Sequence, residues 1–150
     1  MTVKFPHPGE GKRGEEGYLG YLLRQAAHAS RSDLERALSD INLTHPQFVV
    51  MTMVGAYAGL PNADIARLSL LTPPTVSVIV GNLKRAGLIS STKHQTHGRI
   101  QQLELTDTGK KTLKSCKRHV LAAEKRLASG LSPADQDVVR RWLAQIAAGN

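Results

Sequence analysis

The chain has 150 residues, of which 41% are hydrophobic and 4% aromatic, and a formal net charge of +8 at pH 7. This composition fits one compact domain and excludes a wholly disordered chain, while the single cysteine excludes an internal disulfide framework. No apolar stretch is long enough to span a bilayer, so we expect a cytoplasmic protein without a membrane partner. The excess positive charge favours a polyanionic partner, nucleic acid first of all.

The first 17 residues are rich in glycine and show no periodicity, which predicts a flexible N-terminal arm. Residues 18–150 are expected to form a single domain. Over residues 18–41 the apolar side chains recur at helical spacing, which predicts one long amphipathic helix. A helix of this length exceeds what a small core can cover, so burial against a second subunit is the natural explanation.

A capping box opens the next predicted helix. Thr44 and Gln47 have the required spacing, and the almost wholly apolar stretch from Pro46 to Ala58 predicts a buried helix. Asn62 is then expected to cap a short helix over residues 63–68.

The following helix is delimited at both ends. Thr72 is expected to be its cap and Pro73 its first residue, and the helix is expected to run to about Ala86 and stop at Gly87. Together with the short helix before it, this predicts a helix-turn-helix.

Residues 88–92 and 100–106 have the composition of two short strands, separated by a polar, basic stretch that contains glycine. This pattern predicts a β-hairpin with a projecting tip. A helix-turn-helix followed by a hairpin is the order of a winged helix, here about residues 44–106. A second long helix is expected over residues 106–130, and Ser132 with Pro133 opens a last one.

The second helix of the predicted helix-turn-helix is the candidate recognition helix. Its apolar side chains should pack inward, while small and polar side chains face the other way and can meet base edges in the major groove. Amides at the start of the helix can also bind a phosphate. The candidate DNA-contacting residues on this helix are Thr72, Pro74, Thr75, Ser77, Val78, Asn82, Lys84 and Arg85. The alternative is that these small residues merely surround a core helix.

The tip of the predicted hairpin supplies the other candidate contacts. Arg99 on a flexible tip suits the narrow minor groove, and Lys93 and His97 can add phosphate contacts. Residues 62–111 contain seven Lys or Arg against three Asp or Glu, so binding to DNA should weaken steeply with salt. For an isolated arginine, an ordinary solvated hairpin would be the better interpretation; the preceding helix-turn-helix reverses that judgement.

Several stretches together resemble the MarR family of bacterial transcription regulators: IARLSLLTPPTVS (65–77), LKRAGLI (83–89), Arg99 and LTDTG (105–109). The resemblance covers nearly everything after the N-terminal arm. It implies a mainly α fold with a small β-hairpin wing, in which the winged helix-turn-helix is flanked by long dimerisation helices at about 18–41 and 107–148. It also implies a homodimer that grips a pseudo-palindromic operator in double-stranded DNA, a repressor released by a small, often aromatic, ligand. No cofactor and no enzymatic activity are implied.

The sequence departs from the family pattern in the wing and in the recognition helix. The family wing commonly reads Asp-x-Arg, in which the Asp orients the Arg, whereas here His97 replaces the Asp and Gly98 replaces a frequent second Arg. Val78 and Asn82 stand where the family often has Arg. We therefore expect fewer charged base contacts, and binding that is weaker or pH-dependent because a protonated His97 can meet a phosphate.

The resemblance points to an effector pocket between the first, second and fifth helices. The polar or soft residues available there are Arg24, His28, His45, Phe48 and Met51, a set that suits an aromatic carboxylate. Each residue has an equally good alternative role, on a solvated face for Arg24 and His28 and in the core for Phe48 and Met51.

A different class of function would use the only cysteine. Cys116 and His119 are three residues apart on one predicted helix, close enough for the imidazole to favour a thiolate. With His94 and His97 they have the ligand types of a zinc site, but on a winged-helix fold the two pairs would lie on distant elements. We expect neither a metal site nor catalytic residues, and keep a thiol- or metal-responsive sensor or enzyme as the alternative.

Overall fold

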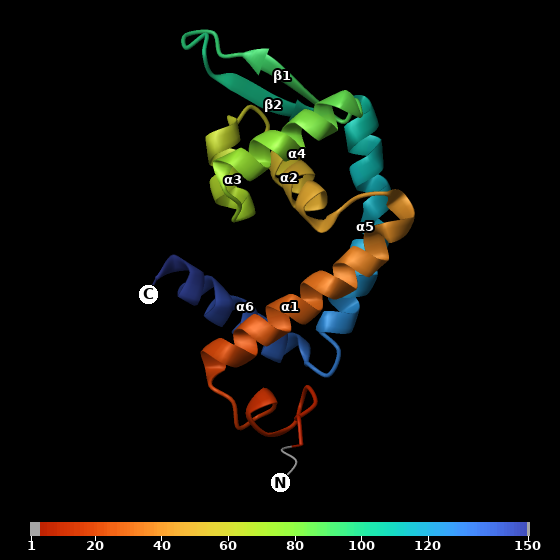
Figure 1. Cartoon of the computed structure of the whole chain (residues 1–150), viewed down its shortest axis with the longest axis vertical. Coiled ribbons are helices and arrows are strands. Elements are labelled where there is room, and N and C mark those ends of the chain that lie inside the picture. The colour runs from red at the N-terminus through yellow and green to blue at the C-terminus, as the bar shows by residue number, and fades with distance from the viewer. Residues whose placement is uncertain (1–3, 150) are drawn as a thin grey trace.

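The structure is a computed structural model that describes residues 4–149 (Figure 1). Its order is a one-turn 3-10 helix η1 (Gly11–Arg13), α1 (Leu19–Leu38), a second 3-10 turn η2 (Ser39–Ile41), α2 (His45–Ala56), α3 (Asn62–Ser69), α4 (Pro73–Arg85), β1 (Ile89–Lys93), β2 (Gln101–Leu105), α5 (Asp107–Leu127) and α6 (Pro133–Ala148). The two strands pair antiparallel, with Ile89 opposite Leu105. The predicted mainly α fold with one β-hairpin is confirmed.

Side-chain caps start most of these helices where the sequence predicts them. Thr44 Oγ1 accepts from the Gln47 amide at 3.2 Å, and Gln47 Oε1 accepts from the Thr44 amide at 3.1 Å, which completes the capping box. Thr72 and Ser132 likewise accept from the amide three residues on, each followed by proline. These bonds satisfy amides that the first turn of a helix leaves without a partner.

The prediction for Asn62 is wrong by one position. Pro61 occupies the cap position of α3 in an extended conformation, and Asn62 is the first helical residue. The fixed φ of proline already suits this entry into the helix. The Asn62 side chain is therefore available elsewhere, and it donates to Ser77 Oγ on α4 at 3.4 Å.

The core lies inside the helix-turn-helix and beneath the hairpin. Helices α3 and α4 are bent by 108° at the break between them, as in a helix-turn-helix. The hairpin is fixed to this body by backbone bonds: the Gly59 amide donates to Leu103 O at 2.9 Å, and the Leu103 amide donates to Leu60 O at 3.1 Å. Fully buried side chains from α1, α2, α3, α4, β2 and α5 fill the core: Leu38, Val50, Met51, Val54, Ile65, Val76, Leu83, Leu103 and Cys116.

The start of α5 packs directly on the loop that follows α4. Thr106 Oγ1 donates to Gly87 O at 2.6 Å, and Gly87 has a φ of +74°, the left-handed terminator that the sequence predicts. A Cβ at Gly109 would lie 2.0 Å from Leu88 O, so only glycine allows this approach. The start of α5 is therefore in direct contact with the loop that follows the recognition helix.

The helix-turn-helix and hairpin form one end of the molecule, α1 and α6 lie at the other, and α5 runs from the first end to the second (Figure 1). Arg126 of α5 binds Asp33 of α1 at 2.9 Å. The described part of the N-terminal arm, whose sequence shows no periodicity, folds back on α1, since Gln25 Nε2 donates to Arg13 O at 3.0 Å.

Within residues 4–149 no single helix is long and apolar enough to cross a membrane; only the bent pair α3 and α4 meets that test, by length and composition.

Candidate nucleic-acid interface

Helix α4 has one buried face and one exposed face. Val76, Ile79, Val80 and Leu83 are all buried, as their spacing predicts. The opposite face is open to solvent and carries the predicted contacts Pro74, Thr75, Ser77, Val78 and Asn82. Val78 is 64% exposed, which leaves its methyl groups accessible to a thymine methyl.

The start of α4 does not offer the amides that a phosphate would need. Pro73 and Pro74 have no N–H, and the Thr75 amide donates to Thr72 Oγ1 at 3.4 Å. Thr72 Oγ1 in turn donates to Thr75 Oγ1 at 2.8 Å. The prolines and the cap therefore leave few amides at this helix start for a phosphate, and phosphate binding there stays a prediction.

Four predicted contacts on α4, namely Ser77, Asn82, Lys84 and Arg85, already have hydrogen-bond partners within the chain. The Arg85 guanidinium donates to Asn82 Oδ1, Lys84 Nζ donates to Gln101 Oε1 of β2 at 3.2 Å, and Ser77 Oγ accepts from Asn62. All of these bonds are solvent-exposed, so each is weak and exchangeable. They bias the orientation of these side chains without fixing it.

The hairpin tip carries the cation that the sequence assigns to the minor groove. Arg99 is exposed, as are Lys93 and His97. The tip is closed by the His94 amide, which donates to Ile100 O at 2.8 Å, and by the Ile100 amide, which donates to His97 O at 2.9 Å. Arg99 therefore occupies the third position of a four-residue turn from His97 to Ile100.

A polar hollow of about 320 Å³ lies between the base of the tip and the start of α3, lined by Pro61, Asn62, Ala63, Arg99, Ile100 and Gln101. The hollow places Arg99 of the wing beside Asn62 and Ala63 of α3, which are not among the predicted DNA contacts. Asn62 and Gln101 were missed because their role depends on the fold: one bridges to Ser77 and the other to Lys84.

The geometry of Cys116 is that of a core residue. Its side chain is fully buried, and Sγ donates to Thr112 O at 3.3 Å. Burial raises the pKa of the Cys116 thiol, against a smaller opposing effect of the hydrogen bond with Ser115. A thiolate is therefore disfavoured. His94 and His97 lie on the wing tip, far along the fold from the middle of α5, and residues 4–149 contain no cluster of three or more possible metal ligands.

The five candidate effector residues have different environments. Arg24 and His28 are exposed on α1, His45 and Phe48 are half-buried, and Met51 is fully buried. Burial lowers the pKa of His45, Arg31 lowers it further, and Glu35 acts in the opposite direction. Arg31 lies about two helical turns beyond Arg24 on α1, so Arg24 and His45 sit at different heights along that helix.

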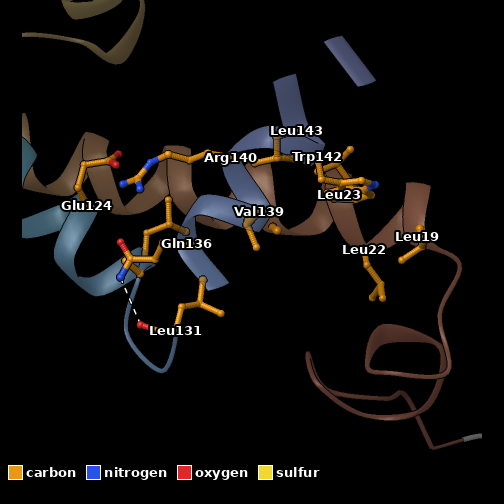
Figure 2. Close-up of a pocket in the computed structure, with 13 residues that line it drawn as sticks. Leu19, Leu22, Leu23, Glu124, Leu131, Gln136, Val139, Arg140, Trp142 and Leu143 are labelled. Carbon is orange, nitrogen blue, oxygen red and sulfur yellow. Dashed lines mark hydrogen bonds between the residues drawn. The ribbon is translucent and has the colours of Figure 1, made fainter. Parts of the chain in front are cut away.

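An apolar groove of about 460 Å³ lies between α1, α5 and α6. Figure 2 shows leucines of α1 together with Val139, Trp142 and Leu143 of α6 among the side chains that line it. Several of these side chains remain open to solvent; Leu19 is 69% exposed, and Leu143 is 40% exposed. None of the five candidate effector residues lines this groove.

Comparison with known proteins gives the family. Residues 41–100 match the model of the MarR family. The HTH-type transcriptional repressor Rv2887 of Mycobacterium tuberculosis (strain ATCC 25618 / H37Rv) is 30% identical over 132 residues, which make up 88% of this chain and 95% of that repressor. The chain belongs to the MarR family.

Solved structures give the same result for the fold. The transcriptional repressor CouR, solved with a 23-mer DNA duplex, has a TM-score of 0.80 and 29% identity, with 88% of this chain and 94% of CouR covered. The M. tuberculosis MarR family protein Rv2887, crystallised with salicylic acid, has a TM-score of 0.71 and 30% identity, with 88% and 98% covered. The predicted winged-helix fold is confirmed, and this MarR chain is a transcriptional regulator whose relatives are named as regulators and repressors rather than enzymes.

The segment matched to the MarR model includes α2, α3, α4, β1 and most of the wing tip. All of the predicted DNA-contacting residues, from Thr72 to Arg99, fall inside it. The groove between α1, α5 and α6 lies mostly outside it.

Proposed function

We propose that this MarR regulator is a homodimeric, sequence-specific repressor that binds a pseudo-palindromic site in double-stranded DNA. The observation that carries the proposal is the pairing of the exposed face of α4 with the exposed Arg99 of the wing tip. A helix in the major groove and an arginine in the adjacent minor groove read one stretch of duplex together. The contacts are those predicted: Thr72, Pro74, Thr75, Ser77, Val78, Asn82, Lys84, Arg85, Lys93, His97 and Arg99.

Binding to the DNA that flanks its own gene tests this function. We expect fluorescence anisotropy to show tighter binding to this duplex than to unrelated DNA, with affinity that falls steeply as salt rises. Arg99→Ala should weaken binding more than tenfold, or about 1.4 kcal/mol. Arg36→Ala, which removes an exposed arginine of α1 outside both the winged helix and the apolar groove, is the matched control and should leave affinity unchanged. Equal affinities for wild type and Arg99→Ala would refute the assignment of the wing.

We propose that a second copy of the chain covers the apolar groove between α1, α5 and α6. The exposed apolar side chains of this region belong inside an interface rather than in water: Leu19, Leu127, Leu131, Val138, Trp142, Leu143 and Ile146. A twofold axis in the protein would match a pseudo-palindrome in the DNA.

We propose that a small aromatic carboxylate releases the repressor from DNA, because a relative has been crystallised with salicylic acid. The expected site is the predicted one between α1, α2 and α5, whose candidate residues are Arg24, His28, His45, Phe48 and Met51. Since Met51 is fully buried, it can contribute only the floor of such a site.

Salicylate itself is the probe for the effector. We expect it to raise the melting temperature of the protein and to release bound DNA, both increasingly as its concentration rises. Arg24→Ala should shift the salicylate concentration for half release upward by about tenfold, since it removes a charged partner of the carboxylate. Benzyl alcohol, which lacks the carboxylate, serves as the control ligand. If salicylate and benzyl alcohol act alike, the carboxylate site is refuted.

A further inference from the structure

The imidazole of His94 is part of the hydrogen bonding of the wing tip, residues 94–100. Its Nδ1 atom lies 3.2 Å from the Thr96 amide nitrogen, 3.2 Å from the His97 amide nitrogen and 3.0 Å from Thr96 Oγ1. A backbone amide can only donate, so Nδ1 must be the acceptor. This geometry fits the tautomer that carries its proton on Nε2.

This first turn leads directly into the turn that carries Arg99. The His97 amide donates to the imidazole of His94, and the His97 carbonyl begins the next turn by accepting from the Ile100 amide at 2.9 Å. The His94 amide closes the whole tip by donating to Ile100 O at 2.8 Å. His94 thus fixes both the entry to the tip and its first turn, and Arg99 follows two residues after the last amide that the imidazole holds.

We propose that His94 is a positioning residue of the wing: its neutral imidazole, through Nδ1, holds the turn from which Arg99 is presented to DNA. The role is the one that Asp and Asn side chains have when they accept from backbone amides in turns. It rests on the DNA-binding function proposed above. It differs from a direct phosphate contact, which would use the outward Nε2–H instead.

Protonation of the His94 imidazole would weaken this turn. An imidazolium has protons on both nitrogens, so Nδ1 can no longer accept and would face two amide hydrogens. The groups around it do not reverse this effect: the ring of His97 lies 5.4 Å away between centroids, and Lys93 and Arg99 are cations. On α3, which lies against the base of the tip, Asp64 is bound to Arg67 at 2.6 Å. Acidification therefore loosens the tip.

Two isosteric variants separate the two ring nitrogens. His94→Asn places an amide oxygen where Nδ1 lies, whereas His94→Gln places its amide group near the position of Nε2. At pH 7.5 we expect His94→Ala and His94→Gln to weaken binding to the gene-flanking duplex by about fivefold, since the turn loses its acceptor. His94→Asn should bind within about twofold of wild type. If Gln restores binding and Asn does not, His94 contacts DNA directly and the proposal is overturned.

NMR of the free protein tests the same turn without DNA. Nitrogen chemical shifts of the His94 ring should report the Nε2–H tautomer at pH 7.5. On lowering the pH to about 5, where histidine side chains are mostly protonated, the amide signals of Thr96 and His97 should move in wild type but far less in His94→Asn. A His97→Gln control should retain the wild-type response. An Nδ1–H tautomer, or equal responses in wild type and His94→Asn, would overturn the proposal.

These measurements distinguish a failure of the proposed DNA binding by the wing from a failure of the proposed positioning role of His94. If Arg99→Ala binds DNA like wild type while the amide signals respond as expected, the DNA-binding role of the wing fails and the turn held by His94 stands. If Arg99→Ala loses affinity and both His94→Ala and His94→Gln bind like wild type, the wing binds DNA and the positioning role of His94 fails.

Discussion

His45 connects the stability of the fold to pH, because its imidazole is half-buried where α1 meets α2. Burial lowers its pKa below the ordinary value of 6.5, so the unfolded chain takes up the proton first as the pH falls. The contribution of the neutral imidazole is therefore present above about pH 6.5 and is lost below it.

We expect the free energy of unfolding to fall between pH 7.5 and 5.5, and to fall less in His45→Gln than in wild type. Urea unfolding at the two pH values measures the difference. His28→Gln, which changes an exposed histidine of α1, is the control and should behave like wild type. An identical pH response in His45→Gln and wild type would contradict the assignment.

For single residues, the sequence predicts which side of a helix is buried but not which distant side chain is a hydrogen-bond partner. The period of the helix was enough to place Val76 and Leu83 inward and Val78 outward, and the structure confirms it. The partners of Lys84 and Asn62 could not be predicted, because they lie 17 and 15 residues away and depend on how the hairpin and α3, respectively, pack against α4. The turn held by His94 was missed because histidine, unlike Asp or Asn, is not a usual acceptor in turns.

At the scale of elements, the helix starts were the most predictable features. Thr44, Thr72 and Ser132 each supply a side-chain acceptor three residues before the amide they bind, a local arrangement that sequence alone specifies. Asn62 was misassigned because Pro61, which has no side-chain acceptor, takes the cap position. The turn in the N-terminal arm was not visible either, since it depends on a side-chain bond from Gln25 on α1.

The junction between α4 and α5 is where one methyl group should have a large effect. Gly109→Ala would put a Cβ 2.0 Å from Leu88 O, so either α5 or the loop after α4 must shift. We expect a loss of about 3 kcal/mol in the free energy of unfolding, in the range of other backbone clashes in a packed site. Chemical unfolding followed by circular dichroism measures it.

Gly81→Ala is the matched control for that change. Gly81 lies inside α4, and its added Cβ would meet nothing closer than the Arg85 guanidinium at 3.6 Å. Because alanine favours a helix interior over glycine, this variant should be more stable by up to about 1 kcal/mol. Similar losses in both variants would show that the contact with Leu88 is not the cause.

At the scale of the molecule, the apolar groove predicts how the chain assembles. Leu143→Glu puts a charge into the groove between α1, α5 and α6, and should raise the dimer dissociation constant about 100-fold, or about 2.7 kcal/mol. Sedimentation equilibrium measures this. Leu70→Glu makes the same change at a leucine that is 91% exposed in the helix-turn-helix, and it should leave the dimer intact. If both variants remain dimeric, a different surface joins the two copies.

The contact between Gly109 and Leu88 turns α5 into a lever arm. The helix has 21 residues and is therefore about 31 Å long, with the apolar groove at one end and the recognition helix fixed to the other. A rotation of about 5° about the groove end displaces the far end by about 3 Å, close to the 3.4 Å step between neighbouring bases. A ligand that tilts α5 by so small an angle would move α4 out of register with the operator, without any change inside the winged helix itself.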